Sequence, residues 1–220
     1  MPRILFEKKG NAVWISHLDL MRLFQRAFKR AGLPLTHTQG FNPRPSVSIA
    51  LPLSVGVESG CELLDFELDG EQVEGSIIRD RLNAYLVPGI RVRKVYDDGG
   101  KIKNLALLDT VVTLEYDEGV PGGAVEALES FFRQGEIPVE KKTKSNGIQD
   151  QNISPMIKSL EAVQTDNCTI QLKARLCCQN PTLNPMQLHG AIVRHLPGLA
   201  PSFAKCERVE LYDKEGNIFR

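Results

Sequence analysis

The sequence predicts an α+β protein made of two consecutive units that share one order of elements. Apolar residues repeat at helical and strand spacings in the order strand, helix, strand, strand, helix, strand. A turn-rich segment, Asp97-Asp98-Gly99-Gly100, follows, and the same order then begins again. The 220 residues, 42% hydrophobic and 25% charged, are enough for one large or two small globular domains. We therefore expect two tandem ferredoxin-like, or split βαβ, units with antiparallel sheets.

The first unit is expected to span residues 1–98. Its clearest element is a helix at about 16–31, because Ser16 and Asp19 form a capping pattern ahead of a regular apolar stripe. Gly32 and Pro34 end that helix. The remaining predicted elements are strands at about 3–9, 46–54, 61–69 and 90–96 and a helix at about 71–86.

The second unit is expected to span residues 105–220. Its predicted elements are strands at 109–117, 136–143, about 168–177 and 204–212 and helices at 121–134 and 184–196. It differs from the first by an insertion at about 144–165, which opens with the turn dipeptide Asn146-Gly147 and contains a candidate short strand at 157–163.

Composition excludes several classes of protein. Lysine plus arginine equals aspartate plus glutamate at 27 each, so no overall charge favours a polyanionic partner. The five cysteines include no Cys-x-x-Cys pair, which suits a reducing compartment. The N-terminus meets charge too early for a signal peptide, and no run approaches the roughly 18 apolar residues of a membrane span. We expect a cytoplasmic protein with no membrane contact.

Charge is nevertheless segregated along the chain. Residues 1–50 carry eight Lys/Arg against two acids, and the next thirty residues carry one against eight. Arg22, Arg26, Lys29 and Arg30 fall on the helix face opposite the apolar stripe, at spacings that make a continuous row. Such a row can follow phosphates. The alternative is the ordinary solvated face of a surface helix.

The loop after this helix combines an aromatic ring with a guanidinium. Phe41 and Asn42 follow Gly40, and Arg44 stands between Pro43 and Pro45, which stiffen its backbone. A ring and a guanidinium on a stiff loop suit base stacking and phosphate pairing, so we predict RNA contacts here. The alternative is that Phe41 packs into the core and the prolines only shape a connection.

A second basic segment contains Lys141, Lys142 and Lys144 at a strand end that runs into a turn. These lysines are a further candidate RNA contact. Solvated surface charge is the alternative interpretation, and the contact requires that the segment face the first helix.

Catalytic and metal-binding signals are sparse. His17 lies at the helix N-terminus, where the helix dipole favours a neutral ring able to act as a base, although a capping or packing role is the alternative. Histidines and cysteines do not fall at ligand spacing, and no Walker, dinucleotide-binding or Gly-x-Ser-x-Gly motif is present. We expect no metal and no cofactor.

Three runs of sequence carry a family resemblance: SHLDLMR at 16–22, GFNPRP at 40–45 and LPLSVGVES at 51–59. They resemble the bacterial radical SAM-linked proteins, a family of unknown function, here in its stand-alone form. The resemblance implies a cytosolic protein that works beside a radical SAM enzyme, near ribosome and RNA-processing loci. The chain has no Cys-x-x-x-Cys-x-x-Cys motif for an iron–sulfur cluster, so a partner would perform that chemistry.

These observations leave three hypotheses. The first is a non-catalytic RNA-binding or substrate-presenting module acting with a separate radical SAM enzyme, with tRNA or rRNA as possible ligands. The second is a metal-independent endoribonuclease that uses His17. The third is a protein-binding adaptor without RNA contact, docking through the acidic segment 58–74.

Overall fold

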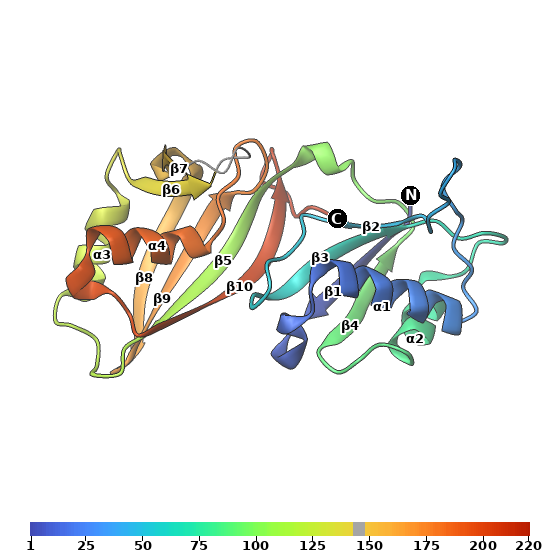
Figure 1. Ribbon diagram of the computed structural model, residues 1–220, viewed down its shortest axis with the longest axis horizontal. Coiled ribbons are helices and arrows are strands. Elements are labelled where there is room, and N and C mark those ends of the chain that lie inside the picture. Colours follow the sequence, from blue (N-terminus) through green and yellow to red (C-terminus); the bar gives the residue numbers. More distant parts are fainter. Residues whose placement is uncertain (143–147) are drawn as a thin grey trace. The chain divides into compact units, whose positions relative to one another are not determined.

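The chain forms two compact units, each with helices and antiparallel strands (Figure 1). The computed structural model describes residues 1–142 and 148–220. The first unit comprises Met1–Asn104 with Ile218–Arg220, and the second comprises Leu105–Asn217. The predicted α+β class is confirmed by this mixture of helices and antiparallel strands. Within the described part of the chain, no helix is both long and apolar enough to cross a membrane.

The first unit contains a four-stranded sheet and two connecting helices. Its elements are β1 (Arg3–Lys8), α1 (His17–Arg30), β2 (Val47–Ala50), β3 (Glu58–Phe66), α2 (Gly75–Asn83) and β4 (Ile90–Tyr96). The strands lie in the order β4-β1-β3-β2, and every neighbouring pair is antiparallel. Strand β2 ends earlier than predicted because Leu51 has a φ of 49°, which breaks the extended backbone.

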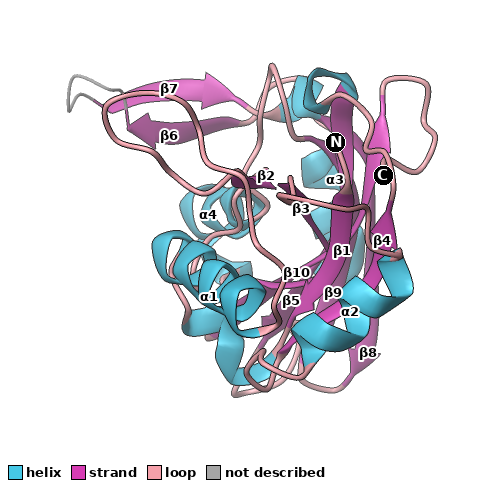
Figure 2. Cartoon of the chain, turned by 90° about the vertical axis from the view of Figure 1, so that its right-hand side faces the viewer, coloured by secondary structure: helices cyan, strands magenta, loops and turns pink. Residues whose placement is uncertain are grey.

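The core of the first unit lies between the sheet and both helices, which Figure 2 shows from a second direction. On α1 the buried side chains follow the predicted helical stripe, Leu20, Phe24, Ala27 and Phe28. The ring of Phe24 packs edge-on against that of Phe6 of β1, with centroids 4.8 Å apart, and Phe28 lies 5.2 Å from Phe66 of β3. This burial orients the opposite face of α1 towards solvent.

Local sequence defines both ends of α1. The Ser16 hydroxyl accepts a hydrogen bond from the backbone N–H of Asp19 at 3.2 Å, as the capping pattern predicts. At the other end Gly32 adopts a left-handed φ of +65°, and the Leu33 N–H donates to the Phe28 carbonyl at 3.0 Å. This hydrogen-bonded reversal turns the chain back along the end of the helix.

The second unit repeats the strand arrangement of the first. Its main sheet contains β5 (Leu105–Glu115), β8 (Ile157–Asp166), β9 (Thr169–Cys177) and β10 (Phe203–Asp213), with α3 (Ala124–Phe132) and α4 (Met186–His195). The strands lie in the order β10-β5-β9-β8, all antiparallel. Helix α3 packs against β8, and α4 packs against β5 and β10.

The strand predicted at 136–143 does not belong to this main sheet. It forms β6 (Pro138–Lys142), which pairs with β7 (Ile148–Asn152) in a separate hairpin. The place beside β9 belongs to β8, from within the predicted insertion at 144–165. Ala162 is the one buried residue of β8, so this edge strand shows little alternation of buried and exposed residues. The earlier segment contains the buried Ile137 and Val139, which made it the stronger candidate for a strand of the main sheet.

The last three residues pack with the first unit, although the sequence places them at the end of the second. The Gly100 N–H donates to the Arg220 carbonyl at 2.8 Å. The Arg3 guanidinium lies 5.1 Å from the centre of the Phe219 ring, and Phe219 is buried. A chain terminus is held in the first unit by these contacts.

Candidate nucleic-acid interface

The exposed face of α1 is basic. Arg22, Arg26, Lys29 and Arg30 are all exposed, because the apolar stripe of the helix is committed to the core of the first unit. The residues lie three, four or one position apart, so they cover about two and a half turns of one helix face.

The positive charge of this face is strongest in the C-terminal half of α1. Arg22 forms an ion pair with Asp19 at 3.1 Å, both side chains being more than half exposed. Hydrogen bonds from Ser16 and then from Arg22 lower the pKa of the Asp19 carboxyl, so it stays ionised and offsets that arginine. In the described ranges, Arg26, Lys29 and Arg30 form no ion pair.

The loop that follows α1 forms two antiparallel arms. The Thr38 N–H donates to the Arg44 carbonyl at 2.8 Å, and the Ser46 N–H donates to the Thr36 carbonyl at 2.8 Å. The Thr38 hydroxyl also accepts from the Arg44 N–H at 3.0 Å. These bonds close the base of the loop and leave residues 39–43 at its tip.

The tip and the adjoining Arg44 present the predicted contact residues of this loop to solvent. Phe41 has a relative exposure of 107%, and Asn42 and Arg44 are also exposed. The alternative in which Phe41 packs into the core is therefore wrong. A fully exposed phenylalanine offers both faces of its ring for stacking. Its apolar surface remains hydrated, which is unfavourable, and packing within the protein does not account for this exposure.

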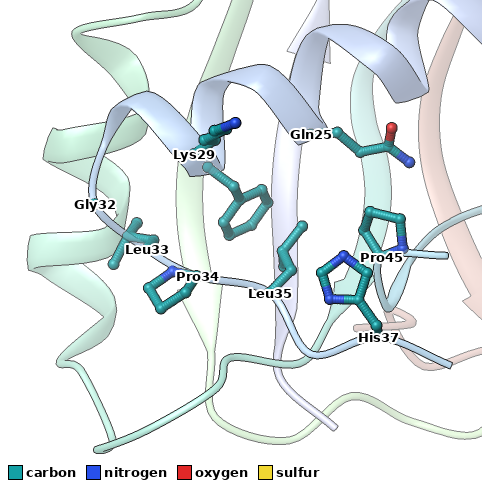
Figure 3. Close-up of a pocket in the computed structure, with 9 residues that line it drawn as sticks. Gln25, Lys29, Gly32, Leu33, Pro34, Leu35, His37 and Pro45 are labelled. Atoms are coloured by element: carbon teal, nitrogen blue, oxygen red, sulfur yellow. The ribbon is translucent and has the colours of Figure 1, made fainter. Parts of the chain in front are cut away.

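A pocket of about 400 Å³ lies between the end of α1 and this loop. Figure 3 shows Gln25 and Lys29 projecting from the helix and His37 and Pro45 standing on the loop below it. The pocket brings the loop arm that carries Arg44 beside the basic face of α1. The sequence does not single out Gln25 or His37 as contact residues. The one signal for them is the chain reversal at Gly32, which returns the chain towards the last turns of α1.

The second basic segment belongs to the second unit, and its contact with RNA stays a prediction. Lys141 and Lys142 belong to β6, where their backbones pair with Gln149 and Ile148. Lys144 lies outside the described residues. The neighbouring Asn152 has a structural role, because its side-chain oxygen accepts from the N–H groups of Ile137 and Ser154.

His17 is the first residue of α1 and is half-buried. An endoribonuclease would also need a cation near His17 to stabilise the charge that develops on the phosphate, and the nearby Arg22 is paired with Asp19. In residues 1–142 and 148–220, no group of three or more His, Cys, Asp or Glu side chains is arranged to hold a metal ion.

The acidic segment 58–74 does not form one continuous docking surface. Asp65 of β3 accepts two hydrogen bonds from Arg3, and Glu58 accepts one from the Gly10 N–H. Glu62 is 1% exposed. The acids of β3 are thus buried or engaged within the unit, whereas Glu67, Asp69, Glu71 and Glu74 after the strand are exposed, so the docking surface of the adaptor hypothesis is limited to these four residues.

The fold and this surface define an α+β protein in which an exposed basic helix leads into an aromatic loop tip. The chain belongs to the bacterial family described as "Uncharacterized protein conserved in bacteria (DUF2344)", whose model matches residues 2–185. A comparison with curated proteins finds no match.

Among solved structures, the chain is similar in fold to a chain of "Crystal Structure of a Cbf5-Nop10-Gar1 Complex", with a TM-score of 0.53 and 9% sequence identity. The match covers 96% of this chain and 48% of that one. "Crystal structure of the archaeal box H/ACA sRNP Nop10-Cbf5 complex" matches with a TM-score of 0.49 and 11% identity, over 94% and 46%. The chain thus spans about half the length of these solved chains.

Proposed function

We propose that this protein is a non-catalytic RNA-binding or substrate-presenting module whose contact surface is the basic face of α1 with the tip of loop 36–46. One observation carries the proposal. Arg26, Lys29 and Arg30 of α1 are exposed without ion pairs in the described part of the chain, and the loop that follows this helix carries a fully exposed Phe41.

This surface combines two kinds of contact that RNA can make, one with its phosphates and one with its bases. Unpaired cations attract phosphates and release their counterions, which supplies affinity without sequence preference. An exposed aromatic ring adds stacking on unpaired bases, which tolerates any base. Together they suit single-stranded segments or loops of RNA, including those of tRNA or rRNA.

A radical SAM enzyme is the proposed partner. The resemblance of residues 16–22, 40–45 and 51–59 to radical SAM-linked proteins supports this, and the chain itself lacks the three-cysteine cluster motif. In this arrangement the present chain holds the RNA and the partner performs the chemistry.

We further propose that both units are ferredoxin-like, with boundaries near residues 98 and 105. In each unit the first strand lies between the fourth and the third, and two helices make the crossover connections. This order is the one expected of a split βαβ unit.

The test is the salt dependence of RNA binding. Fluorescence anisotropy with a single-stranded RNA should give a slope of log affinity on log salt of about 0.7 per phosphate contact, so the double variant Arg26→Glu, Lys29→Glu should lower the slope by about 1.4. The matched control is Lys101→Glu, Lys103→Glu, which reverses two exposed charges of the same unit away from α1. Unchanged binding by the α1 variant would refute the proposal.

A further inference from the structure

We propose that the pocket between α1 and its following loop binds one unpaired RNA base. This inference rests on the proposed function and deepens it, because it names what part of the RNA the surface selects. The pocket has a volume of about 400 Å³, within the range of sites that enclose a small organic group.

The floor of the pocket is apolar. Pro34 is exposed and Leu35 and Pro45 are half-buried, so these three residues present apolar surface to the pocket, above the buried Phe28 and Leu33. A surface of this kind gains from covering by a flat, weakly hydrated ring, which a nucleobase provides. A free phosphate or other small anion would leave that floor unused.

The rim supplies polar side chains that have no hydrogen-bond partner in the part of the chain that the structure describes. In residues 1–142 and 148–220, the side chains of Gln25, Lys29 and His37 make no hydrogen bond. The carboxamide of Gln25 carries a donor and an acceptor side by side, which matches the edge of a base. The imidazole of His37 offers a flat face for stacking.

Charge around the pocket selects a polyanion over an apolar peptide. Lys29 is itself at the rim, and Arg26 and Arg30 are neighbours on the same helix without ion pairs in the described part of the chain. A phosphate on each side of the bound base would meet these cations. An apolar side chain in the pocket would instead bury the polar groups of Gln25 and His37 without partners.

The base must be unpaired, because a base stacked and paired within a duplex has neither its faces nor its edge free to enter the pocket. Single-stranded loops and ends present such bases directly. A base drawn from a helix would first have to be unstacked and flipped. We therefore expect the pocket to prefer single strands over duplexes of the same charge.

The experiment compares tetranucleotides of RNA with abasic tetranucleotides of equal charge, using fluorescence anisotropy and the full chain. The wild type should bind the base-containing oligonucleotide about tenfold or more tightly. Gln25→Trp, which fills the pocket, should reduce this preference and keep the salt-dependent binding of the abasic strand. The matched control is Leu18→Trp, an exposed apolar position on the same helix.

The tryptophan of Gln25→Trp could itself stack on the base and keep the preference, so a second variant is needed. Gln25→Ala, His37→Ala removes the polar partners, leaves the pocket open, and should lower the preference by a similar factor. Thermal melting of each variant verifies that the first unit remains folded.

The outcomes separate the two proposals. Equal affinity of the wild type for both oligonucleotides, with salt-dependent binding, overturns the pocket and leaves the RNA-binding surface standing. A preference that survives in both pocket variants also overturns it and locates the base elsewhere, with Phe41 the first candidate. Absence of binding to either oligonucleotide removes both proposals.

Discussion

Arg175 of β9 holds both carboxylate oxygens of Asp109 of β5, with Nε–Oδ1 and Nη2–Oδ2 distances of 2.8 and 2.9 Å. The Tyr212 hydroxyl donates to the same carboxylate at 2.8 Å, and its ring lies 4.1 Å from the arginine guanidinium. Three strands of the second unit are therefore joined by one cluster. Parallel hydrogen bonds of this kind fix the register of adjacent strands as well as adding stability.

Replacing Asp109 should cost stability in a pH-dependent way. Burial opposes ionisation, but hydrogen bonds from Arg175 and Tyr212 prevail and lower the pKa of the Asp109 carboxyl. Its contribution is therefore present above the unfolded value of about 3.9 and is lost as the pH falls through the folded value. Because both partners are about one-third exposed, we expect Asp109→Asn to cost about 1 kcal/mol near neutral pH.

Urea unfolding at about pH 7 and about pH 2.5 measures this effect, since the difference between wild type and variant should shrink at the lower pH. Asp117→Asn, at an exposed position of the same unit, is the control. Equal stability of wild type and Asp109→Asn at neutral pH would contradict the expectation.

The buried Lys8 should be a second determinant of stability. Its ammonium donates to the carbonyls of Val13 and Ile15 at 3.1 and 2.9 Å, next to the start of α1. We expect Lys8→Met to cost about 1–3 kcal/mol, because two carbonyls lose their donor. Chemical denaturation of both proteins measures the difference, with Lys101→Met as an exposed control.

The contribution of Lys8 to stability should change with pH in a defined direction. Desolvation by burial outweighs the field of Glu62 and lowers the pKa of Lys8. Between the folded pKa and the unfolded value of about 10.4 the unfolded chain binds more protons, so the wild type should gain stability as the pH rises through that window. A gain of the same size in Lys8→Met would show that another group causes it.

Gly89 should not tolerate a side chain. Its φ is +87°, and a Cβ atom would clash with the Lys9 carbonyl oxygen and lie 2.9 Å from the Ala12 Cβ. Backbone strain and the clash together predict a loss of about 3 kcal/mol for Gly89→Ala, measured by thermal or chemical unfolding. Gly216→Ala has a similar φ and open space, so it should lose only about 1 kcal/mol, and equal losses would exclude the clash.

Phe41→Ala should separate binding from stability. The ring is fully exposed, so its removal should leave the melting temperature unchanged. Loss of a stacked base should weaken binding of single-stranded RNA by about 1–3 kcal/mol. Anisotropy titration beside a melting curve tests both statements, and a marked drop in melting temperature would indicate that the ring packs within the protein.

His17 provides the test of the endoribonuclease alternative. We expect no cleavage when the wild type is incubated with RNA in EDTA, and no difference between wild type and His17→Ala. A positioned general base contributes roughly 10² to 10⁴ in rate, so genuine catalysis would be visible on a gel. Cleavage in EDTA that disappears in His17→Ala would make the chain an enzyme.

Sequence reasoning succeeded where local signals act alone. The helix predicted at about 16–31 is α1 (His17–Arg30), because its cap, its apolar stripe and its stop at Gly32 are all encoded within one segment. The strand at 136–143 shows the limit. Its apolar residues indicate a buried strand, but they do not determine which sheet that strand joins. The strand that pairs with β9 is β8, although only one residue of β8 is buried.

The sequence by itself determined that α1 turns Arg22, Arg26, Lys29 and Arg30 to solvent, because a helix whose apolar stripe is buried has only one face left for them. Tertiary structure alone decided which of these charges remain unneutralised and that the following loop closes a pocket against the end of α1. The tertiary structure also brings Asp109, Arg175 and Tyr212 into one hydrogen-bonded cluster, although these residues are up to 103 positions apart in the sequence. Contacts of that kind depend on strand register and chain reversal, which short-range periodicity does not encode.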